Sequence, residues 1–120
     1  MDNMKFVSFI NENVRESVVN IVEEDLNSIA IKNDYLNELS IWYNQTSSLE
    51  KQIIKKLLYR VYDCAAWKIL SVLDNDKFFG GRFELIYVNE LTGEKSSLID
   101  PPYLDELHDL YEPLFKEKKK

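Results

Sequence analysis

SSLEKQIIKKLLYRVYDCAAWKILSVL, residues 47–73, decides the fold, because it is the longest stretch of the chain with helical periodicity. Ser47 and Glu50 stand three residues apart, the spacing of a capping box in which the two side chains bind each other's backbone amides. We therefore expect one long helix over 47–73. Its apolar residues recur at three- and four-residue steps, and we expect them to face the core: Ile54, Leu57, Leu58, Val61, Ala65, Ile69 and Val72.

The second half of this helix, residues 64–73, is apolar around its whole circumference except chiefly for Lys68. A helix that is apolar on all sides is normally buried on all sides. We therefore expect this segment to form the centre of the fold, with Cys64 as a small core residue. The opposite side of the first half carries polar side chains, which we expect to meet water or neighbouring acidic helices: Lys51, Lys55, Lys56, Tyr59, Arg60 and Asp63.

Two further helices are expected before the long one. Over the first 30 residues, apolar side chains at helical spacing predict an amphipathic helix with one buried stripe: Phe6, Ile10, Val14, Val18, Ile21, Val22 and Ile29. A shorter helix is expected from about Asp34, with Leu36, Leu39 and Tyr43 on one face.

A β-hairpin and a last helix are expected after the long helix. Residues 82–88 are rich in aromatic and β-branched side chains, Thr92-Gly93 can form a turn, and residues 95–99 can return antiparallel. We expect Phe83, Leu85 and Tyr87 to pack on the helices. Asp100-Pro101 predicts the start of a last helix, which Pro113 is expected to end or kink.

These elements predict a mainly helical α+β fold, with three or four helices around a long central helix and one antiparallel β-hairpin. A chain of 120 residues is expected to form one domain. We place that domain at 1–115 and expect the lysine-rich segment 116–120 to be a flexible tail.

Composition excludes several functional classes. The net charge of -6 disfavours nucleic acid or an anionic membrane as a partner, and no uncharged stretch approaches the roughly 18 residues of a membrane-spanning helix. Cys64 is the only cysteine, so no disulfide forms within the chain, and the first ten residues lack the apolar core of a signal peptide. We therefore expect a cytoplasmic protein. One His and one Cys supply few strong ligands, so we expect neither a metal nor a cofactor.

Charge is distributed unevenly along the chain. Residues 1–30 carry a net charge of -4 and residues 101–115 carry -4, whereas residues 47–73 carry +3. If the acidic segments adjoin, they form a surface that attracts a basic protein. We therefore expect a non-catalytic module that binds another protein and leave self-association open. The candidate contacts are Glu12, Glu16, Glu23, Asp105, Asp109 and Glu112.

An enzymatic or ligand-binding function is the alternative. His108 has Asp105 about one turn before it and Glu112 about one turn after it, so the three side chains can share a helical face. A carboxylate beside an imidazole is the arrangement of a general base. The same spacing also occurs on any acidic helix with one histidine, which is the interpretation that we favour.

The C-terminal half of the chain resembles small, uncharacterised bacterial proteins. The resemblance rests on Leu73-Asp74, on residues 81–88, on Leu98-Ile99-Asp100 and on residues 107–111. Some small acidic bacterial proteins of this size neutralise toxins. The resemblance therefore implies an immunity or inhibitor protein as one form of the expected binding module.

Overall fold

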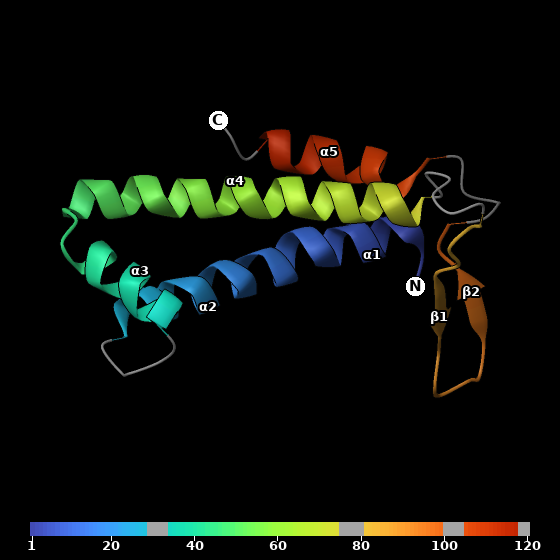
Figure 1. Cartoon of the computed structure of the whole chain (residues 1–120). Coiled ribbons are helices and arrows are strands. Elements are labelled where there is room, and N and C mark those ends of the chain that lie inside the picture. The colour runs from blue at the N-terminus through green and yellow to red at the C-terminus, as the bar shows by residue number, and fades with distance from the viewer. Residues whose placement is uncertain (29–33, 75–80, 100–104, 118–120) are drawn as a thin grey trace.

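The long helix is present where the capping box predicts it. The structure is a computed structural model that describes residues 1–28, 34–74, 81–99 and 105–117, and helix α4 (Ser48–Leu73) runs through its length (Figure 1). The Glu50 amide donates to Ser47 Oγ at 3.1 Å, and the Ser47 amide donates to Glu50 Oε1 at 3.0 Å. The helix ends at Asp74, as the sequence predicts.

The N-terminal segment is helical throughout but changes its winding. Helix α1 (Asn3–Phe9) continues into the π-helical segment η1 (Ile10–Val14) and then into α2 (Arg15–Asn27). Arg15 pairs with Asp63, and Glu23 pairs with Lys55. Because the second pair lies later on α2 and earlier on α4, the two helices run antiparallel. Helix α3 (Asp34–Asn44) then packs against α2.

The hairpin forms in the expected place but is shorter than predicted. Strands β1 (Ile86–Val88) and β2 (Lys95–Ser97) pair antiparallel, with Tyr87 opposite Ser96, and Gly93 adopts a φ of 73° in the connection. Glycine takes this left-handed conformation without a Cβ penalty. Leu85 packs against the helical core, whereas Phe83 and Tyr87 are exposed, so the expected packing of those two aromatic rings is wrong.

The last helix, α5 (Leu107–Glu117), begins later than the sequence predicts. The cap expected at Asp100 lies outside the described residues, and the helix that the structure shows starts at Leu107. Pro113 lies inside α5 and does not end it. The main core forms where α1, α4, α5 and the hairpin meet, and its fully or nearly buried members are Val7, Ala66, Leu70, Leu107 and Tyr111.

The buried face of α4 is not the one that periodicity predicts. Asp63 is only 3% exposed, whereas Leu57 is 59% and Val61 is 58% exposed. Cys64 is also exposed, so the second half of α4 is not buried all round and Cys64 is not a core residue. Asp63 accepts from Arg15 of α2 and from Tyr111 of α5, and the Tyr62 hydroxyl donates to the Ile10 carbonyl of η1. The side of α4 that packs against the other helices therefore carries Asp63, Tyr62 and Ala66.

On the N-terminal helices, too, the buried side chains differ from the apolar stripe that the sequence predicts. Val19 is buried on α2, while Val18 and Ile21 from the predicted stripe are exposed. Ile29, the last member of that stripe, lies outside the described residues. The mainly helical α+β class is nevertheless confirmed, with α1, η1 and α2 along one side of α4 and α5 along another (Figure 1).

The molecule is elongated for its length. Its radius of gyration is 18.0 Å and its extents are 51 × 34 × 32 Å. A compact domain of this size has a radius of gyration of about 14 Å. The difference arises because α2, α3 and the first half of α4 extend away from the main core (Figure 1).

Candidate functional site

The two acidic segments adjoin in part. Both α1 and η1 contact α5, which brings the part of the N-terminal segment that carries Glu12 against the C-terminal acidic segment, whereas Glu16 and Glu23 lie on α2 beside α4. Glu12, Asp105 and Asp109 are exposed there. Glu112 is half-buried and forms an interaction within the chain. The acidic surface is defined below as Glu12, Glu16, Glu23, Asp105, Asp109 and Glu112.

Part of this acidic charge is neutralised by α4. Lys55 Nζ lies 3.3 Å from Glu23 Oε1, and the Tyr59 hydroxyl donates to both oxygens of Glu16 at 2.8 and 2.9 Å. Burial, together with the adjacent Glu16 carboxylate, raises the pKa of Tyr59 to about 12. The basic side of α4 therefore meets acidic α2 in part, which leaves Glu12, Asp105 and Asp109 as the more accessible carboxylates.

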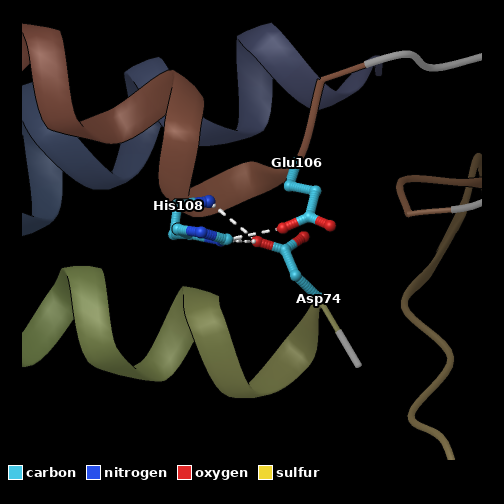
Figure 2. Close-up of side chains that lie close together, drawn as sticks. All are labelled: Asp74, Glu106 and His108. Atoms are coloured by element: carbon cyan, nitrogen blue, oxygen red, sulfur yellow. Dashed lines mark hydrogen bonds and ion pairs between the residues drawn. The ribbon is translucent and has the colours of Figure 1, made fainter. Parts of the chain in front are cut away.

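His108 lies at the start of α5 and contacts carboxylates from two elements. His108 Nδ1 lies 2.7 Å from Asp74 Oδ2 and 3.4 Å from Glu106 Oε2 (Figure 2). His108 Nε2 lies 3.4 Å from Asp109 Oδ1. The Trp67 ring meets the imidazole edge to face, with 5.4 Å between the ring centroids.

Asp74 is the group that organises this cluster. It stands at the end of α4, and its side chain is only 2% exposed. Its carboxylate accepts the backbone amides of Leu107 and His108, each at 2.8 Å, and so satisfies the first amides of α5. Besides capping α5, the Asp74 carboxylate also contacts the His108 imidazole. One residue thereby ends α4 and caps α5.

The electrostatic surroundings favour the charged imidazole. Burial alone lowers the pKa of His108, but the hydrogen bond with Asp74 and the charges of Asp109, Asp74 and Glu106 outweigh it, so the pKa is raised. The predicted partners of His108 were Asp105 and Glu112. In the structure the Asp105 carbonyl accepts from Asn3 Nδ2 at 3.3 Å, and the close carboxylates of His108 are those of Asp74, Glu106 and Asp109.

Asp74, Glu106 and His108 also have the spacing of a potential metal site. Their nearest ligand atoms all lie within 4.8 Å of one another. Both Asp74 oxygens already accept hydrogen bonds from α5, however, and His108 Nδ1 faces one of them. Helix capping therefore accounts for the geometry without a bound ion.

A second buried network joins three helices and was not foreseen from the sequence. The Arg15 guanidinium donates to both Asp63 oxygens, at 2.9 and 3.1 Å, and the Tyr111 hydroxyl donates to Asp63 Oδ1 at 2.9 Å. Burial and the Asp63 carboxylate raise the pKa of Tyr111. No local motif marks these residues, because the partners stand 48 positions apart.

Comparison with known proteins found no relative of this chain. The chain matched no family model, no curated protein and no solved structure. Among the described residues, no helix has both the length and the apolar character that crossing a membrane requires.

Proposed function

We propose that this protein is a non-catalytic module that binds a basic region of another protein through the acidic surface. The observation that carries the proposal is the contact of α1 and η1 with α5, which brings Glu12 beside the C-terminal segment 101–115 of net charge -4. Like charges on adjoining helices are unfavourable for the isolated chain. A basic partner would relieve that repulsion and would be attracted from a distance.

The accessible carboxylates define where contact is expected. Glu12, Asp105 and Asp109 are exposed, so a Lys or Arg of a partner can reach them without breaking a buried interaction. Asp109 also lies 3.4 Å from His108 Nε2 but keeps 60% of its side chain exposed, whereas Glu16 and Glu23 bind Tyr59 and Lys55 of α4. We assign the main contacts to the first three and a supporting electrostatic role to the others.

The finer form of the proposal is an immunity or inhibitor protein that acts in the cytoplasm. The resemblance of the C-terminal half to small bacterial proteins supports this class. The single cysteine fits a reducing compartment. An inhibitor needs to cover a partner's site and requires no catalytic group of its own.

The test is affinity capture from the native host with the full chain as bait. Wild type is compared with the triple variant Glu12→Lys, Asp105→Lys, Asp109→Lys. We expect wild type to retain a protein with a basic surface, with an affinity that falls as salt rises, and the triple variant to lose at least about 90% of it.

The control carries the same change in charge at a different place. Glu38→Lys, Glu90→Lys and Glu94→Lys alter exposed carboxylates on α3 and in the hairpin region. This control should retain the partner. If the acidic-surface variant keeps both its helical circular dichroism and its partner, the acidic surface is not the binding site.

A further inference from the structure

A row of apolar side chains on α4 faces away from the other helices and strands that the structure describes. Leu57 and Val61 expose more than half of their surface, Cys64 is exposed and Ile54 is half-buried. These four residues, called the α4 seam below, follow one another at steps of three, four and three. At about 3.6 residues per turn they share the side of α4 opposite the buried Asp63.

The seam has the pattern of a coiled-coil interface. Alternating steps of three and four residues keep one side of a helix against a partner helix. Three further apolar side chains, Leu58, Ala65 and Ile69, widen the seam on one side. Continuing the same steps outward reaches Glu50 at one end and Lys68 at the other, both exposed. The seam is thus an apolar strip bounded by one acid and one base.

The described elements leave this strip without a second layer of structure. An apolar helical face is normally buried against another element, and the elongated shape shows that the first half of α4 lies outside the main core.

We infer that the α4 seam is the interface of an antiparallel homodimer. In an antiparallel pair, the numbers of any two facing residues add up to the same value. The charged residues at the two ends of the seam fix that value, because Glu50 and Lys68 attract each other. Placing Glu50 opposite the partner's Lys68 also places Ile54 opposite the partner's Cys64 and Leu57 opposite the partner's Val61. Each pair of facing residues in the seam is then either two apolar side chains or an ion pair.

The same charges exclude the parallel arrangement. There Lys68 faces the partner's Lys68 and Glu50 faces the partner's Glu50, which places like charges together at both ends. In the antiparallel pair the two Arg60 side chains lie near the symmetry axis, but at its solvent-exposed margin, where water screens their repulsion. Charge complementarity therefore selects a second, antiparallel copy as the occupant.

The oligomeric state of the full chain is the first test. Analytical ultracentrifugation at about 100 µM should show a dimer for wild type and a monomer for Leu57→Asp. Leu57 is exposed in the single chain, so its helical circular dichroism should be unchanged. The matched control is Ile41→Asp on α3, which is 63% exposed and lies off the seam, and it should remain dimeric.

Cysteine cross-linking tests orientation and register, and does not depend on a disruptive variant. Ile54→Cys, with native Cys64 present, should form a disulfide-linked dimer under mild oxidation. The two residues lie about 15 Å apart within one helix, too far for an internal disulfide. Ile54→Cys combined with Cys64→Ser should not cross-link, and neither should Gln52→Cys with native Cys64.

Two results would overturn the inference. A wild-type chain that is monomeric at this concentration shows that no second copy covers the seam. A wild-type dimer that cross-links through its native Cys64 pair shows a parallel arrangement. Variants of the seam change the oligomeric state, whereas variants of the acidic surface change the capture of a partner protein. This inference and the proposed function can therefore fail separately.

Discussion

The Asp63 carboxylate accepts two hydrogen bonds from the Arg15 guanidinium, at 2.9 and 3.1 Å, across 48 residues of sequence. Both side chains are largely withdrawn from water, with 12% of the Arg15 side chain and 4% of the Asp63 side chain exposed. The Tyr111 hydroxyl donates to the same carboxylate. Helices α2, α4 and α5 are thereby joined at one buried group.

Removing this charge should be strongly destabilising. Asp63→Asn leaves the Arg15 guanidinium in the same place without its counter-ion, and an unpaired buried charge costs about 3 kcal/mol. Urea unfolding monitored by circular dichroism measures the loss. Glu84→Gln is the control, because it breaks the exposed Arg82–Glu84 pair and should cost less than about 1 kcal/mol. Equal losses in the two variants would contradict the central role given to Asp63.

Alkaline titration should show a late phase that contains Tyr59 and Tyr62. Burial, with a smaller contribution from Asp63, raises the pKa of Tyr62 to about 12, and the pKa of Tyr59 is raised to about 12 as well. Absorbance near 295 nm should therefore show only part of the 7 tyrosines ionising around pH 10 in the folded protein. Tyr59→Phe should remove one group from the late phase and leave the early phase intact.

The pH dependence of stability should report the His108 contacts. Because the pKa of His108 is raised in the folded state, the folded protein binds that proton more tightly than the unfolded chain. The resulting stabilisation is complete below the ordinary value of 6.5 and is lost as pH rises through the folded-state pKa. The difference in unfolding free energy between wild type and His108→Gln should therefore shrink as pH rises above 6.5. A difference that grows over this range would refute the assignment.

Asp74→Ala should weaken the start of α5. The substitution removes the acceptor for the Leu107 and His108 amides, which should cost about 1 to 2 kcal/mol and raise hydrogen exchange in the first turn of α5. Ser47→Ala, which removes the cap of α4, provides the comparison. Its loss should be about 1 kcal/mol, and its exchange should increase at α4 and not at α5.

Substitutions on α2 should distinguish the observed stripe from the predicted one. Val19 is 1% exposed and Val18 is 37% exposed. Val19→Ala should lower the free energy of unfolding by about 2 kcal/mol, because it leaves a cavity, while Val18→Ala should lower it by less than about 0.5 kcal/mol. Urea unfolding of the two neighbouring variants gives the comparison directly.

Local signals in the sequence predict the elements well. The capping box at Ser47 and Glu50 places the start of α4, and the Thr92-Gly93 turn places the hairpin. Both signals act between residues that are close in sequence, where backbone geometry decides the outcome. Element type and approximate position could therefore be predicted.

Which face of a helix is buried could not be predicted. Periodicity counts apolar residues, and on α4 the strip with Leu57 and Val61 is more apolar than the face with Asp63 and Tyr62. The buried face is stabilised by partners that lie far away in sequence, such as Arg15 for Asp63 and the Ile10 carbonyl for the Tyr62 hydroxyl. The partner of His108 was missed for the same reason, since Asp74 stands 34 positions before it.

The double role of Asp74 also sets how freely the chain can vary. Its bond to the Leu107 amide closes a loop that spans 33 positions and contains the hairpin. The entropy of loop closure grows only with the logarithm of length, so even doubling such a loop costs about 0.6 kcal/mol. Insertions and deletions at the hairpin tip should therefore be tolerated in evolution, while the ends of α4 and α5 that meet at Asp74 are held constant.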